Sequence, residues 1–161
     1  MIHLDKGWDK STQLWWYNGL LATGQVSADD IDVLGVSFYP FWGTEATISN
    51  LQSSLDGLAS KYAKPVMVVE TDWPVKCTSV TLSNTAIPIS ADGQKSWVTQ
   101  VESVLNDVPN SLGQGLYYWE PAFINDTSLG SKCEDAILFD VDWKSWPNTK
   151  ATARSSASLY T

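Results

Sequence analysis

The sequence has little positive charge, a single histidine and no long apolar run among its 161 residues. No stretch approaches the roughly 20 apolar residues that a transmembrane helix needs, so we expect no membrane span. Lysine and arginine number 10 against 18 aspartates and glutamates, which gives a formal net charge of −8. An acidic surface repels phosphate backbones and anionic lipids, so neither nucleic acid nor a membrane is an expected partner.

The same scarcities disfavour several kinds of catalysis. Ser-His-Asp catalysis needs a histidine beside a nucleophile, yet the only histidine is His3 and no serine lies in a GxSxG turn. A zinc site needs clustered His, Cys or acidic ligands, and the sequence offers no such cluster, so we expect no metal and no cofactor. Nucleotide binding loses its main support because no GxGxxG or GxxxxGK[ST] loop follows an expected strand.

Aromatic residues, in contrast, are plentiful: nine Trp, six Tyr and four Phe. Most of these rings are expected in the core, although aromatic faces also stack on pyranose rings in sugar-binding clefts.

Cys77 and Cys133 are compatible with one disulfide, and Asn125 opens an N-glycosylation sequon. Both features favour a secreted protein. The N-terminus lacks a signal-peptide core, so either a segment is missing or the chain is cytoplasmic.

The hydrophobic pattern alternates short apolar runs with longer amphipathic segments. Strands are expected over residues 1–5, 33–39, 65–70 and 115–120, helices over 14–22, 47–62 and 93–105, and a loop followed by a short helix over 143–161. This alternation is typical of parallel βαβ units in a single α/β domain, and the apolar strands indicate a sheet covered on both faces. Four such strands make half of a (β/α)₈ barrel.

Polar side chains collect where the expected strands end, at Asp5, Tyr39, Glu70 with Asp72, and Glu120. That edge carries the active site in an α/β barrel and the ligand site in an open doubly wound sheet. Carboxylates at this edge favour glycoside hydrolysis, which uses two of them. The residue pattern alone predicts Glu70 and Glu120 as the two catalytic carboxylates. Glu120 precedes Pro121, however, and could equally stabilise a loop through hydrogen bonds.

Five stretches carry a resemblance to a known family. They are IHLD-x-GWD (2–9), GVSFYPF (35–41), VVETDWP (68–74), IPISADGQ (87–94) and YWEPAFI (118–124). In this order they resemble the arabinogalactan endo-β-1,4-galactanases of glycoside hydrolase family 53, especially the fungal ones. The resemblance implies a retaining enzyme with a (β/α)₈ barrel that degrades β-1,4-galactan and is secreted as a full-length protein.

By this resemblance the chain is the C-terminal half of the barrel, strands 5 to 8, forming one partial catalytic domain over residues 1–161. Glu70 matches the nucleophile at the end of strand 7. The acid/base glutamate at the end of strand 4 would lie upstream of Met1, so the isolated chain is expected to be inactive. Glu120 then becomes a substrate-binding residue at the rim of strand 8 instead of the acid.

The resemblance also implies roles for neighbouring residues. Tyr39 would donate a hydrogen bond to the nucleophile and keep it ionised and oriented. The Trp119 ring would form the base of the subsite that binds the reacting sugar. The cleft would be lined by Asp5, Trp8 and Trp73. A Cys77–Cys133 disulfide would join the loops after strands 7 and 8, as expected for a fungal-type member that holds these loops without a metal ion. The sequence departs from the family at Lys6 and Asp72, where Asn is more frequent.

Two other interpretations remain open. The chain could be a non-catalytic glycan-binding remnant that keeps the aromatic cleft and self-associates through its open sheet edges. Alternatively, an internal methionine was taken as the start codon, because Met1 falls within a strand sequence that ordinarily has chain before it.

Overall fold

The protein is built on a four-stranded parallel sheet. The computed structural model describes residues 1–78, 80–123, 133, 135–145 and 147–160. The strands are β1 (Ile2–Leu4), β2 (Leu34–Ser37), β3 (Val66–Thr71) and β4 (Gly113–Tyr118), in the order β1-β2-β3-β4 with every neighbouring pair parallel. The sequence order and the spatial order agree, which confirms the predicted succession of βαβ units.

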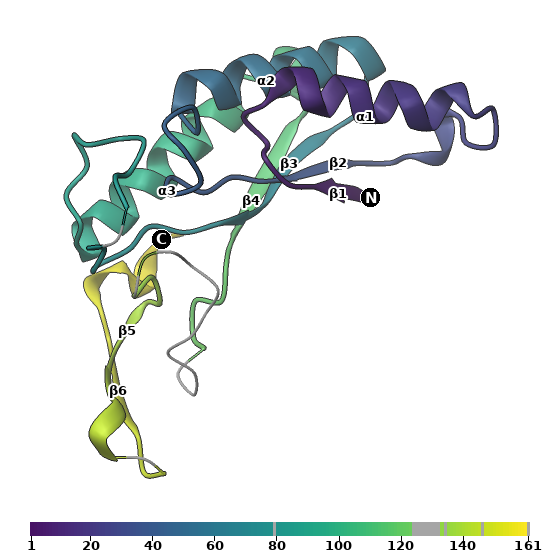
Figure 1. The fold of residues 1–161 in the computed structure, drawn as a ribbon. Helices are drawn as coiled ribbons and strands as arrows, with labels where there is room; N and C mark the ends of the chain where they lie inside the picture. Colours follow the sequence, from purple (N-terminus) through teal and green to yellow (C-terminus); the bar gives the residue numbers. More distant parts are fainter. Residues whose placement is uncertain (79, 124–132, 134, 146, 161) are drawn as a thin grey trace.

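Three crossover helices lie on one face of this sheet (Figure 1). They are α1 (Lys10–Ala22), α2 (Ile48–Tyr62) and α3 (Ala91–Asn106). Each begins at a residue whose side chain accepts a hydrogen bond from a first-turn backbone amide: Asp9, Thr47 and Ser90. Short 3₁₀ helices occur in the connections and near the C-terminus, at Ala28–Asp30, Pro109–Ser111, Trp143–Ser145 and Ser155–Ser158.

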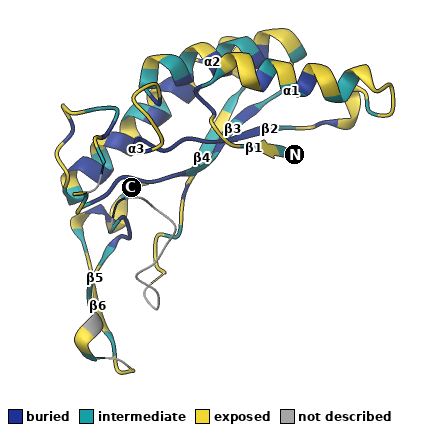
Figure 2. Ribbon diagram, in the orientation of Figure 1, coloured by how far each residue is buried: buried dark blue, intermediate teal, exposed yellow. Residues whose placement is uncertain are grey.

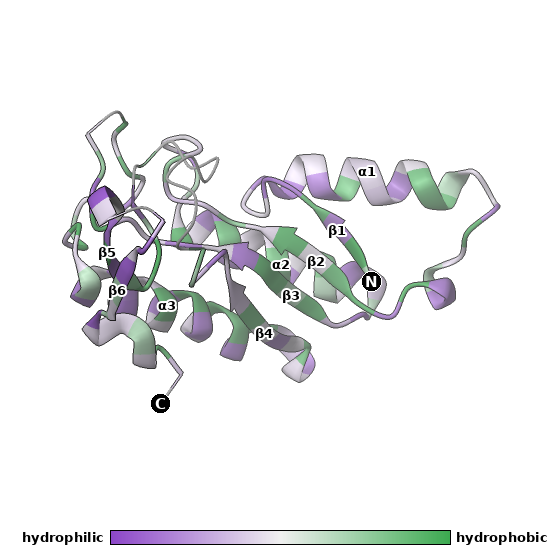
Figure 3. Cartoon of the chain, turned by 90° about the horizontal axis from the view of Figure 1, so that it is seen from below, coloured by the Kyte–Doolittle hydropathy of each residue, from purple (hydrophilic) through white to green (hydrophobic). Residues whose placement is uncertain are grey.

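The core lies between the sheet and the helices. Leu34 and Val36 of β2 and Val66 and Val68 of β3 are buried in one cluster with residues of α2 and α3. Figure 2 shows buried segments where the helices face the sheet. The central strands β2 and β3 are largely hydrophobic (Figure 3). Met67 and Val69 are half-buried on the side away from the helices. Among the residues that the structure describes, helices cover one face of the sheet, in contrast to the predicted cover on both faces.

A β-hairpin projects from the side of the sheet opposite the helices (Figure 1). It consists of β5 (Phe139–Asp142) and β6 (Lys150–Ala153), paired antiparallel. The prediction of a loop over this region was wrong for β6, although the short helix at its end is present. All four β6 residues are exposed, and the run Lys150–Ala153 contains no large apolar or aromatic side chain that would indicate a strand. Arg154 anchors the hairpin with hydrogen bonds to Asp135 and Asp140.

Cys77 and Cys133 form a disulfide, as predicted. The bond joins the loop after β3 to the segment that precedes the hairpin, and the backbone N–H of Val75 donates to the carbonyl of Asp135 nearby, at 2.7 Å. The two loops beyond the carboxyl ends of β3 and β4 are thereby held together. Asn125 lies outside the described residues. Within the described ranges, no helix has the length and apolar character to cross a membrane.

Candidate active site

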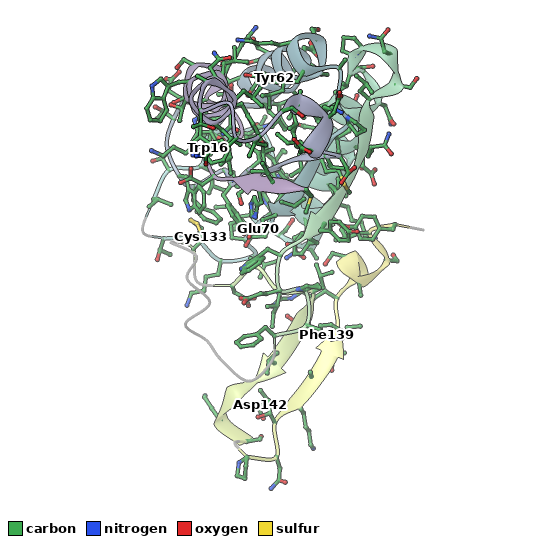
Figure 4. All side chains as sticks on the ribbon, turned by 90° about the vertical axis from the view of Figure 1, so that its right-hand side faces the viewer. Trp16, Tyr62, Glu70, Cys133, Phe139 and Asp142 are labelled. Carbon is green, nitrogen blue, oxygen red and sulfur yellow. A yellow bond between two sulfur atoms is a disulfide. The ribbon has the colours of Figure 1, made fainter. Side chains whose placement is uncertain are left out.

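Glu70 reaches the open face of the sheet through a β-bulge. The ladder pairs Val36 with Val68 but Ser37 with Glu70, so β3 carries one extra residue, Val69. Val68 and Thr71 are fully buried on the helix side, whereas Val69 and Glu70 are both half-buried. Strict alternation after Val68 would send the Glu70 side chain toward the helices. The bulge turns it instead to the face that carries Ser37, away from the helices (Figure 4).

The backbone around Glu70 is fixed by a chain of buried hydrogen bonds. The N–H of Phe38 donates to the Glu70 carbonyl at 2.8 Å. The Thr71 hydroxyl donates to the Phe38 carbonyl at 2.6 Å and accepts from the Trp97 indole N–H at 2.8 Å. Helix α3 thus helps to hold the end of β3 in place. A carboxylate on such a support keeps its direction when a ligand arrives.

The two oxygens of the Glu70 carboxylate have different surroundings. Oε2 accepts hydrogen bonds from the Ser37 hydroxyl at 3.0 Å and from the Tyr39 hydroxyl at 3.1 Å. Oε1 has His3 Nδ1 at 3.9 Å, which is beyond hydrogen-bond distance. The pKa of Tyr39 is raised, first by burial and then by the neighbouring carboxyls of Asp72 and Glu70, so its phenol keeps its proton and remains a donor.

Asp72 is a second carboxyl close to this site and is almost completely buried, at 2% exposure. Its Oδ1 has no hydrogen-bond partner among the described residues. Burial, followed by the charge of Glu120, raises the pKa of Asp72 to about 8. This carboxyl therefore holds a proton at neutral pH, because burial removes the water that would solvate its charge.

The aromatic residues predicted to line the cleft separate into two groups. Trp119 lies past the end of β4 with 38% of its surface exposed, and its backbone N–H donates to the Thr71 carbonyl at 2.8 Å. Trp8 is 9% exposed and packs between Phe38 and Trp42. Trp73 is fully buried, with its indole N–H bound to the Pro88 carbonyl, so it offers no face to a sugar and its predicted place in the cleft is wrong.

The two remaining acidic residues of the predicted site lie at strand ends. Glu120 is half-buried and has a φ of 44°, a left-handed conformation that is rare for a residue other than Gly, Asn or Asp. The Asp5 side chain is exposed, while its carbonyl accepts a hydrogen bond from the Gln13 amide at 2.6 Å. Helix α1 thus supports the loop after β1 through the backbone and leaves the Asp5 carboxylate facing solvent.

Sequence reasoning missed three residues that the structure adds to the site. Ser37 and His3 connect to Glu70, and Trp42 is 37% exposed with its ring 4.6 Å from that of Tyr39. Ser37 precedes Tyr39 by two positions in the predicted strand 33–39, so period-2 alternation would have placed both on one face. Within the described ranges, no group of three or more His, Cys, Asp or Glu side chains is arranged to hold a metal ion.

The strands are parallel and joined by crossover helices, and Glu70 lies at the carboxyl end of a central strand, which is the edge where α/β barrels carry their active sites. The chain belongs to Glycosyl hydrolase family 53, which it matches over residues 1–151. This confirms the resemblance seen in the five sequence stretches.

Individual relatives and solved structures agree. The chain is 43% identical to arabinogalactan endo-beta-1,4-galactanase A of Emericella nidulans over 99% of its length, covering 44% of that protein. It is 46% identical to the arabinogalactan endo-beta-1,4-galactanase of Thermothelomyces thermophilus, covering 42% of that protein. A fungal β-1,4-galactanase structure superposes with a TM-score of 0.88 at 43% identity, over 99% of this chain and 46% of that one. The chain thus spans less than half the length of these relatives and has a partial α/β-barrel fold, as predicted.

Proposed function

We propose that this chain supplies the nucleophile of a retaining endo-β-1,4-galactanase, with Glu70 as the attacking carboxylate. The observation that carries the proposal is the asymmetric environment of that carboxylate. Both hydroxyl donors, Ser37 and Tyr39, bind Oε2. Among the described residues, no hydroxyl binds Oε1, which lies on the open face of the sheet. An oxygen that forms a bond to carbon needs a free lone pair directed at that carbon, and fewer donors on Oε1 leave more of its lone pairs free.

In the proposed reaction, Glu70 Oε1 attacks the anomeric carbon of a galactosyl unit while the bond to the leaving sugar breaks. A second carboxylic acid donates its proton to the departing oxygen, and its carboxylate then removes a proton from the water that hydrolyses the glycosyl ester. Ser37 and Tyr39 hold Oε2, which remains the carbonyl oxygen of the ester. The hydroxyls therefore fix the same geometry before and after the attack.

We assign the acid/base to a part of the enzyme outside these 161 residues. In retaining enzymes the two carboxyls stand roughly 5 to 5.5 Å apart, and both must reach the sugar. Asp72 is the closest carboxyl to Glu70 in sequence, and it is sealed from solvent. The relatives are more than twice as long as the matched region, so they contain the chain in which such a residue would lie. The isolated chain is then expected not to turn over galactan.

A neutral, linear galactan is the substrate we propose. The exposed rings of Trp119 and Trp42 supply apolar faces near the carboxylate, and a net charge of −8 disfavours anionic polymers. The relatives are named as galactanases. We also propose an extracellular setting for the complete protein, because the Cys77–Cys133 disulfide persists under oxidising conditions.

The test is a chimaera in which this chain replaces the matched segment of the Emericella nidulans enzyme. Reducing-sugar release from linear β-1,4-galactan is measured for the chimaera, for its Glu70→Gln variant and for the 161-residue chain alone. We expect activity in the chimaera only, lowered at least about 1,000-fold by Glu70→Gln. Turnover by the chain alone would refute the assignment of the acid/base elsewhere. Binding without turnover in every form, unchanged by Glu70→Gln, would favour a glycan-binding remnant.

A further inference from the structure

The only histidine of the chain is connected to Glu70 through Ser37. His3 lies on β1, and its Nε2 is 2.7 Å from the Ser37 hydroxyl oxygen. The Ser37 hydroxyl in turn lies 3.0 Å from Glu70 Oε2. Ser37 itself is buried, so water does not compete for its hydroxyl. Three neighbouring strands thus contribute one side chain each to a continuous hydrogen-bonded row, His3–Ser37–Glu70.

Counting protons fixes the direction of both bonds. A serine hydroxyl has one hydrogen to donate and two lone pairs to accept with. A carboxylate oxygen can only accept, so the single hydrogen of Ser37 lies between Ser37 and Glu70. The hydrogen between His3 and Ser37 must then come from the imidazole. His3 is therefore held as a donor at Nε2, and its Nδ1 faces Glu70 Oε1 from 3.9 Å.

We propose that His3 is a positioning residue for Glu70 and acts through Ser37. By donating to the Ser37 hydroxyl, His3 fixes the rotation of that hydroxyl so that its hydrogen points at Oε2. Oε2 is then held by Ser37 and Tyr39, and Oε1 is aimed at the substrate. Direct attraction between imidazolium and carboxylate is a minor contribution, because the two side chains are 36% and 22% exposed and solvent screens the charges. This inference rests on the proposed role of Glu70.

The hydrogen bond itself is testable without enzyme activity, because a single histidine gives one set of ring signals. In the ¹⁵N-labelled 161-residue chain, at a pH where the ring is neutral, we expect the hydrogen on Nε2 and a slowly exchanging Nε2–H proton. Ser37→Ala should abolish that slow exchange, whereas Ser96→Ala, at an exposed serine of α3, should not. A hydrogen on Nδ1 in the unmodified chain, or an Nε2–H signal unaffected by Ser37→Ala, would overturn the proposal.

The positioning role is tested in the chimaera by a double-mutant cycle. We expect His3→Leu to lower kcat roughly 10-fold with KM unchanged, and His3→Gln, whose amide can donate to Ser37, to retain most of kcat. The His3→Leu/Ser37→Ala double variant should be no slower than Ser37→Ala alone, because His3 acts only through that hydroxyl. Full kcat in His3→Leu, or multiplicative losses in the double variant, would contradict the proposal. Activity that survives Glu70→Gln would instead refute the nucleophile assignment. The nuclear magnetic resonance measurement on the ¹⁵N-labelled chain would then still show whether His3 donates a hydrogen bond to Ser37.

Discussion

Replacing Asp72 by Asn should stabilise the protein by an amount that grows with pH. In the folded chain this carboxyl is buried, its Oδ1 has no hydrogen-bond partner in the part of the chain that the structure describes, and its pKa is raised from 3.8 to about 8. Between these two pH values the folded state holds the proton and the unfolded state has released it. The unfolded state therefore binds fewer protons, and the free energy of unfolding falls as pH rises across this window.

The magnitude follows from the same shift. Each pH unit within the window removes at most about 1.4 kcal/mol, so the upper limit over the whole window is about 6 kcal/mol. Relaxation around an ionised Asp72 would reduce this, and we expect about 2–4 kcal/mol. The amide of Asn has no charge to bury at any pH. The difference in unfolding free energy between Asp72→Asn and the unmodified chain should be small near pH 4 and reach this range near pH 8.

The assay is denaturant unfolding followed by tryptophan fluorescence at intervals from pH 4 to pH 9. Subtracting the unfolding free energy of the unmodified chain from that of the variant at each pH cancels the contribution of every titrating group that the substitution does not affect. Asp32→Asn is the matched control, because Asp32 is exposed and its replacement should change the free energy of unfolding by no more than about 0.5 kcal/mol at any pH. A stability difference for Asp72→Asn that is constant with pH, or that shrinks as pH rises, would refute the buried neutral carboxyl.

Three further predictions concern stability and are checked by denaturant or thermal unfolding. Lys6 has a φ of 51°, so Lys6→Asn should stabilise the protein by about 0.5–1 kcal/mol, and a loss would show that the Lys6 side chain makes compensating contacts. Removing the Cys77–Cys133 disulfide, whose cysteines are 56 residues apart, should lower the free energy of unfolding by up to about 4 kcal/mol, and unchanged stability after reduction would contradict this. Gly93→Ala should destabilise the protein by at least about 2 kcal/mol, because the added Cβ would overlap the Pro88 carbonyl. Gly19→Ala in α1 should stabilise it by about 0.5–1 kcal/mol, because nothing lies within 4 Å of the added Cβ. Equal effects at the two glycines would refute the steric argument.

The bulge in β3 marks the limit of what the sequence pattern could predict about the site. The apolar run before Glu70 indicated a strand that ends in a carboxylate, and that is correct. The run does not reveal that Val69 is an extra residue, because Val68 and Val69 are chemically the same. A one-residue change of phase moves every following side chain to the other face. Thr71 and Trp73 consequently point into the core beside α3, which is why the predicted place of Trp73 was wrong.

The contacts across strands were predictable to different degrees. The place of Tyr39 beside Glu70 came from the resemblance to the family, and the hydroxyl lies at hydrogen-bond distance. Ser37 and His3 were overlooked because a serine and a histidine 34 positions apart form no local motif. Their proximity follows only once β1, β2 and β3 are aligned in register, and a sequence pattern does not fix that register. The burial of Asp72 depends in the same way on its tertiary neighbours.

The most direct test of the central claim is to identify the residue that becomes covalently attached to sugar. The chimaera is incubated with a 2-deoxy-2-fluoro galactobioside that carries an activated leaving group, and its peptides are analysed by mass spectrometry. The proposed mechanism predicts one added fluoro-galactobiosyl group on the peptide that contains Glu70, and no addition in the Glu70→Gln variant. Attachment to any other residue, or a labelled Glu70→Gln variant, would contradict the assignment of Glu70 as the nucleophile.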